Sequence, residues 1–233
     1  MRVMSLIMVG ALALTAANLS AESGRQESTE RLQLASDTLK AMIDTPDKGI
    51  PEEVLSNAKC IVVVPHLVKG GFVVGAEHGR GVATCRTPEG WSAPAFVSIG
   101  GGSWGLQIGV EGVDLVMLVM NDHGLQRLLS SKFQIGADAS ASAGPVGRHA
   151  SAGTDWTMKT EILTYSRSNG VFAGISLDGA VVEQDEDSTR AIYGSDPSFH
   201  GVLSGKVRAP SSTLKFLKAV SEAAHTSAVA EAK

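Results

Sequence analysis

The segment from residue 60 to residue 120 constrains the fold most, because it is a series of short β-branched runs separated by glycine or proline. The runs are CIVVVP, GGFVVGAE, GVATCRT, WSAPAFVSIG, GLQIGVEG and VDLVMLVM, a pattern typical of strands joined by turns. Strands resume at Phe133 and continue in EILTYSRS, VFAGISLDG and AVVEQD. An Asn-Gly pair at residues 169–170 predicts a hairpin. The 26 glycines agree with a β-rich chain.

Helices are predicted before, between and after these strands. Residues 29–43 form an amphipathic pattern whose apolar face comprises Leu32, Ala35, Leu39, Met42 and Ile43. Pro51 fits the first position of a short second helix, and residues 121–132 and 210–225 predict a mid-chain and a C-terminal helix. Because strands and helices do not alternate regularly, we expect an α+β fold. It would contain a single antiparallel β-sheet system, barrel-like or sandwich-like, with N-terminal helices, one mid-chain helix and a C-terminal helix.

The tract GADASASAGPVGRHASAGTD, residues 136–155, consists mostly of glycine, alanine and serine. Its alanines alternate with polar residues from Ala137 to Ala143, and the alternation resumes after Pro145. A flexible linker has no reason to keep a period of two, whereas a strand does. The tract therefore predicts two strands whose inward-facing alanines let another layer approach closely.

The first 21 residues have the features of a secretory signal peptide. Arg2 gives a positive start, an apolar run extends from Val3 to Ala17, and Ala21 is a small residue at which cleavage could occur. The alternative is an N-terminal membrane anchor, for which the apolar run is short. We expect cleavage to leave residues 22–233 as one domain, located in the periplasm or secreted.

Cys60 and Cys85 are the two cysteines of the chain. An even number of cysteines in an exported protein favours a disulfide bond. Each cysteine lies in or beside a predicted strand, so neighbouring strands could bring the two together. The alternative is a pair of buried thiols.

The sequence gives no local signature of catalysis, and we expect no enzyme, cofactor or metal. SIGGGSWG and GPVGR do not match a nucleotide-binding loop. The six histidines are scattered, without HExxH, and no serine lies in GxSxG. The catalytic alternative is a hydrolase with a triad that has no local motif. The acidic residues 183–187 lack the spacing of a calcium loop, which predicts a solvated connection. A formal net charge of −4 argues against nucleic acid as a partner.

Several basic residues lie near predicted turns, where they could face anionic lipid headgroups. We select Lys69, Arg80 and Arg148 as candidate lipid-binding residues. Arg148 follows the GPVG turn, where a guanidinium beside free backbone amides can hold an anion. Its alternative role is pairing with a nearby carboxylate. Residues 29–43 could add an apolar insertion, although packing on the sheet is the default expectation for such a helix.

Four motifs occur in the order and spacing of the SYLF domain family, which the chain resembles over residues 57–194. They are VVPHLVKGGFVVGAEHGRGV, WSAPAFVSIGGGSWGLQIGVEGVDLVMLVMN, GADASASAGPVGR and ILTYSRSNGVFAGISLDG. The family includes bacterial exported proteins and eukaryotic membrane-trafficking proteins. The resemblance implies a lipid-binding module whose lipid contact in eukaryotic relatives is attributed to a basic amphipathic N-terminal helix. Residues 29–43 match that helix in place, but only Arg31 and Lys40 are basic.

We therefore expect a non-catalytic protein that contacts acidic phospholipid headgroups at a membrane surface in the cell envelope, as a peripherally associated protein. The alternative is a structural or protein-interaction module of the envelope with a protein partner and no lipid specificity. Some eukaryotic relatives bind actin filaments, but we do not expect actin to be a partner here.

Overall fold

The computed structural model describes residues 2–45, 49–146, 160–168, 170–172, 175 and 177–230, with side chains except those of residues 2–21, 71–75, 103–110 and 225–230. The helices are α1 (Arg2–Ile43), α2 (Glu52–Asn57), α3 (Asp122–Leu129), α5 (Glu186–Tyr193), α6 (Phe199–Leu203), the 3-10 helix η2 (Ser211–Thr213) and α7 (Leu214–Ala230). The strands are β1 (Cys60–Thr87), β2 (Gly90–Trp91), β3 (Ala95–Val119), β4 (Lys132–Gln134), β5 (Ala141–Ala143), β6 (Ile162–Ser168), β7 (Val171–Phe172) and β8 (Val181–Gln184).

The described strands form one curled sheet, which confirms the predicted α+β class. The main path runs β2-β1-β3-β6-β5, while β8 pairs with both β3 and β4, and β7 pairs with β6. The pairs are antiparallel except β5 with β6, which is parallel, so the sheet is mixed and not purely antiparallel. Ser168 pairs with Val171 across the Asn-Gly position, which confirms the predicted hairpin.

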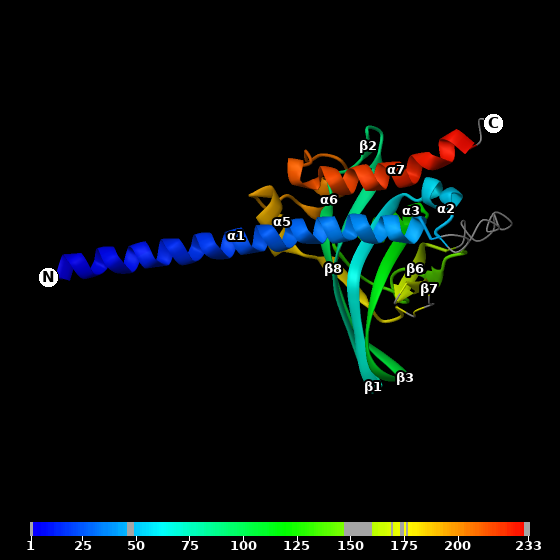
Figure 1. Ribbon diagram of the computed structural model, residues 1–233, viewed down its shortest axis with the longest axis horizontal. Helices are drawn as coiled ribbons and strands as arrows, with labels where there is room; N and C mark the ends of the chain where they lie inside the picture. Colours follow the sequence, from blue (N-terminus) through cyan, green and yellow to red (C-terminus); the bar gives the residue numbers. More distant parts are fainter. Residues whose placement is uncertain are drawn as a thin grey trace.

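The six predicted short strands between residues 60 and 120 are in fact two long ones. β1 and β3 pair with each other along nearly their whole length, from Cys60 opposite Val119 to Ala83 opposite Ala95. The pair bends back sharply, and the bend projects from the body of the molecule (Figure 1). The glycines that suggested separate strands lie inside these two, where they permit the bend.

β1 is doubled over so that its two arms touch. The Arg86 backbone N–H donates to the Lys59 carbonyl at 2.7 Å, which brings the two ends of β1 together. Farther along, a Cβ atom at Gly81 would lie 2.5 Å from the Val63 carbonyl oxygen, and one at Gly79 would lie 2.8 Å from the Leu67 side chain. Only glycine allows the two arms to approach this closely.

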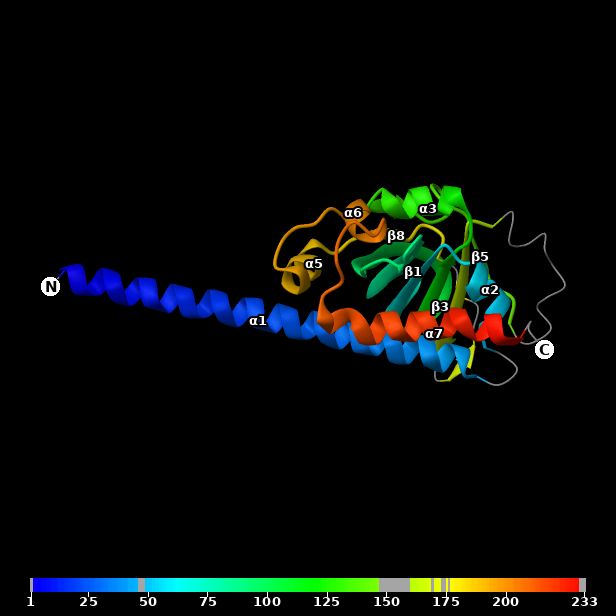
Figure 2. The same cartoon turned by 90° about the horizontal axis from the view of Figure 1, so that it is seen from above.

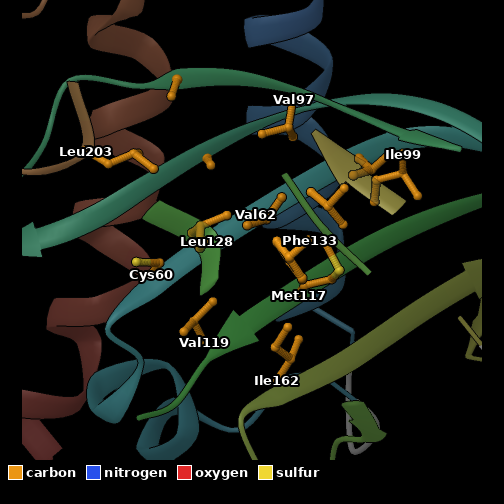
Figure 3. Packing of buried hydrophobic residues seen from close by; sticks show 14 of the residues in the cluster. Cys60, Val62, Val97, Ile99, Met117, Val119, Leu128, Phe133, Ile162 and Leu203 are labelled. Atoms are coloured by element: carbon orange, nitrogen blue, oxygen red, sulfur yellow. The ribbon is translucent and has the colours of Figure 1, made fainter. Parts of the chain in front are cut away.

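Two hydrophobic cores lie on opposite faces of the sheet. The inner core fills the curl and is closed by Leu128 of α3 and by Val202 and Leu203 of α6 (Figure 3). The outer core lies between the other face of the sheet and the helices α1, α2 and α7. Figures 1 and 2 show α1 and α7 side by side over this face, with α3 on the other side of the molecule in Figure 2.

The amphipathic helix predicted at residues 29–43 is the second part of the 42-residue helix α1. Its apolar face packs in the outer core, where Leu32, Ala35, Leu39 and Met42 are at most 1% exposed. The first part of α1 extends away from the body (Figure 2), and the signal-peptide hypothesis for residues 1–21 stays a prediction. Over the part of the chain whose side chains are described, no helix is long and apolar enough to cross a membrane.

The other predicted helices are confirmed with small shifts. Asn121 caps α3 by accepting from the Gly124 N–H, and α7 follows Pro210 and η2. Pro51 is the N-cap of α2 and not its first residue.

The prediction that the acidic residues 183–187 form a solvated connection is wrong. Glu183 belongs to β8, where it pairs with Ser98 and Lys132. Asp185 is the N-cap of α5, and Glu186 and Asp187 occupy the first turn, where their charge favours the positive end of the helix dipole.

The small-residue tract fits its prediction only in part. Ala141–Ala143 forms β5, and a Cβ at the following Gly144 would overlap the Tyr165 ring at 2.1 Å, so a close approach does occur. The inward alternation is wrong, because Ala139 is buried whereas Ala143 is exposed. The predicted second strand lies mostly outside the described residues.

Candidate functional site

Lys69, the first candidate lipid-binding residue, is buried in an ion pair. Its Nζ atom lies 2.8 Å from Oε2 of Glu77, and the two side chains are 9% and 2% exposed. Both residues belong to β1 and lie on either side of its bend, so the pair joins the two arms of the strand. An ammonium group held in this way is not available to a headgroup without breaking a buried pair.

Arg80, the second candidate, lies in a charge network that connects β1 to α1 and α5. Its guanidinium contacts Glu27 of α1, and its Nε atom lies 3.9 Å from Asp185 Oδ2. Arg31 of α1, with a side chain only 7% exposed, approaches Asp185 to 2.8 Å and stacks over the Phe96 ring. Sequence reasoning missed this network, because Arg31 and Asp185 are 154 residues apart.

Asp185 is the centre of this network. Burial disfavours its charged form, but a hydrogen bond from the Ser188 backbone N–H and the bond and charge of Arg31 outweigh burial, so the pKa of Asp185 is lowered. The carboxylate thus caps α5 and anchors α1 at the same time. Arg80 remains half exposed, but its charge is largely balanced by Glu27 and Asp185.

Arg148, the third candidate, lies outside the described residues. The predicted Cys60–Cys85 disulfide is present. It joins the two ends of the doubled strand β1, and both cysteines are at most 1% exposed.

Several polar and ionisable groups in the described part of the chain connect elements of the fold. No group of three His, Cys, Asp or Glu side chains among the described residues could hold a metal ion. Burial raises the pKa values of the Tyr165 and Tyr193 hydroxyls, and Tyr193 donates to the Pro94 carbonyl at 2.6 Å. His123 contacts Glu161 at 2.6 Å, which ties α3 to the strand edge.

An open groove of about 600 Å³ lies between α1 and α5. Arg25 and Arg190 line it, as do Glu22 and Asp187. The opposite charges cancel, so the groove does not select an anion or a cation.

Residues 197–221 form a basic segment that contains none of the three candidate lipid-binding residues. It contains Lys206, Arg208, Lys215 and Lys218 but no aspartate or glutamate, and no other run between acidic residues holds more than two lysines or arginines. All four side chains are exposed. The signal in the sequence is a local excess of positive charge within an acidic chain, and not a position near a predicted turn.

The curled sheet and its two cores form an α+β domain, and the family match places this domain in the SYLF class. The chain belongs to the Ysc84 family, whose model is described as Las17-binding protein actin regulator and matches residues 100–223.

Curated relatives include the SH3 domain-containing YSC84-like protein 1 of Rattus norvegicus, with 34% identity over 167 residues, or 71% of this chain and 49% of that protein. LAS seventeen-binding protein 3 of Saccharomyces cerevisiae is 31% identical over 168 residues, or 70% of this chain and 36% of that protein. The chain therefore spans about half or less of these relatives.

Proposed function

We propose that this protein is a non-catalytic module that binds acidic phospholipid headgroups at a membrane surface. The observation that carries the proposal is the segregation of charge: a protein with a formal net charge of −4 exposes an acid-free basic segment at residues 197–221. Such a segment attracts an anionic surface although the whole molecule is acidic.

The size of this attraction is sufficient for reversible binding. A basic residue near an anionic bilayer contributes about 1 kcal/mol, so Lys206 and Arg208 contribute roughly 2 kcal/mol before any apolar contact. Lys215 and Lys218, which pair with Asp37 and Glu222, raise the sum to at most about 4 kcal/mol. Because this term is electrostatic, it is screened over about 10 Å at 0.1 M salt. We expect moderate, salt-sensitive and peripheral membrane association.

Vesicle sedimentation tests the proposal. The protein should sediment with vesicles of phosphatidylglycerol and phosphatidylcholine at low salt, sediment weakly with pure phosphatidylcholine vesicles, and be released as salt is raised. Equal failure to bind both vesicle types at low salt would reject headgroup binding.

The alternative function is binding to a protein partner. The family description and the name of the yeast relative refer to binding of Las17, which favours a protein-interaction role for the shared domain. An apolar protein contact should survive high salt, whereas headgroup binding should not. We retain two further proposals: export to the cell envelope after cleavage near residue 21, and the absence of actin binding, which a filament co-sedimentation assay would test.

A further inference from the structure

We infer that the membrane contacts this protein through residues 206–218, the loop before η2 and the first turns of α7, and not through the amphipathic part of α1. This inference rests on the proposed headgroup binding and names the surface responsible for it. The two surfaces differ in which apolar and basic side chains remain accessible in the folded domain.

The amphipathic face of α1 is not accessible. Leu32, Leu39 and Met42 are buried in the outer core, and Arg31 is bound to Asp185. Inserting this face into a bilayer would require α1 to leave both the sheet and α7. Insertion would bury these side chains again in the bilayer, but it would expose to water the apolar side chains of the sheet and of α7 that they now cover. Exposing each fully buried apolar side chain costs about 1.5–3 kcal/mol, so detachment would cost more than a few headgroup contacts return.

The loop before η2 presents two accessible cations. Val207 and Ala209 pack against the inner core, whereas Lys206 and Arg208 alternate with them and are exposed. Neither Lys206 nor Arg208 has a carboxylate partner in the part of the chain that the structure describes. The inward residues fix the loop, so the two cations are held outward on an ordered segment.

The first turns of α7 add an apolar residue and two more cations. Leu214 is 57% exposed, and Lys218 lies one turn later on the same side of the helix. Lys215 pairs with Asp37 at 3.4 Å, and Lys218 with Glu222 at 3.7 Å, but these four side chains are 55–76% exposed. Exposed pairs of this kind contribute little, so both lysines can exchange their partners for phosphate groups.

Charge and apolar exposure therefore occur together in this segment. A leucine beside exposed cations matches the interface of an anionic bilayer, where the apolar side chain enters the headgroup region and the cations meet phosphates. The occupant that fits this surface is an anionic lipid bilayer.

Vesicle binding by four forms of the full chain tests the inference. The Lys206→Gln/Arg208→Gln variant should bind phosphatidylglycerol vesicles roughly 30-fold more weakly than wild type. Leu214→Ser should weaken binding about tenfold and leave the salt dependence unchanged. The matched control is Lys59→Gln/Lys132→Gln, which removes the same charge from a partly exposed and an exposed lysine outside the segment and should bind within about threefold of wild type.

The outcomes separate the two proposals. If wild type does not bind anionic vesicles, headgroup binding itself fails. If wild type binds and the segment variants bind equally well, headgroup binding stands and the assignment of residues 206–218 is wrong. Hydrogen exchange provides a second measurement: vesicles should slow exchange in residues 204–218. Faster exchange in residues 29–43 on vesicles would instead indicate that α1 detaches and inserts.

Discussion

The disulfide between Cys60 and Cys85 should provide much of the stability of the doubled strand. The two cysteines are 25 residues apart in sequence, and closing a loop of that length in the unfolded chain removes about 12 cal/mol/K of entropy, or about 3.5 kcal/mol at 25 °C. We therefore expect the free energy of unfolding to fall by about 3.5 kcal/mol when the bond is reduced.

The measurement compares oxidised wild type with wild type that has been reduced in urea and refolded. Urea unfolding followed by circular dichroism gives both free energies by linear extrapolation. The Cys60→Ala/Cys85→Ala variant is the control, because its unfolding should not respond to reductant. It should be less stable than reduced wild type by about 1 kcal/mol, since two buried sulfur atoms are lost.

Two results would refute this reasoning. The first is a difference of less than about 1 kcal/mol between oxidised and reduced wild type, which would mean that the unfolded chain is already compact around β1. The second is reduction of the folded protein by mild thiol without urea, because both sulfur atoms are buried.

Three further predictions concern the fold and its charges. Gly81→Ala should destabilise by about 1–3 kcal/mol in urea unfolding, because its Cβ would meet a backbone carbonyl of the other arm, whereas Gly112→Ala, with nothing within 4 Å, should be close to neutral. Because the pKa of Asp185 is lowered in the folded protein, its carboxylate stabilises the fold above the unfolded pKa near 4, and this stabilisation is lost as pH falls through the folded pKa. Asp185→Asn should therefore make the free energy of unfolding fall less steeply below pH 4. Lys69→Met should lower the free energy of unfolding by about 3–5 kcal/mol, because it leaves the Glu77 carboxylate buried without its partner, and adding Glu77→Leu should recover most of that loss. A Lys69→Met variant as stable as wild type would contradict the buried pair.

Much of the local structure followed from the sequence. The strand runs, the Asn-Gly hairpin and the helix at Asn121 were predicted because turn chemistry and hydrophobic periodicity act over a few residues. The acidic start of α5 was missed although its cap is equally local, since Asp185 accepts from the Ser188 N–H three residues on. Only the contact of Asp185 with Arg31 depends on the tertiary structure.

The candidate lipid-binding residues were harder to predict from the sequence. Lys69 and Arg80 lie near turns or glycines, as accessible cations often do, but the fold brings Glu77, Glu27 and Asp185 against them. A lysine's charge is a property of the residue, whereas its availability depends on carboxylates far away in the chain. Only a count of charges along residues 197–221 pointed to the surface that stays exposed.

The sequence by itself determined which regions form strands, most of the helices, the family and the presence of two cysteines within strand-like runs, but not the helices α5 and α6. The tertiary structure decided that β1 doubles over, that its glycines form the contact between its arms, and that α1 uses its apolar face to cover the sheet. The physical reason is the distance along the chain over which each effect acts. Propensity and periodicity are fixed by neighbouring residues. Burial and charge pairing are fixed by contacts between residues such as Arg31 and Asp185, 154 positions apart.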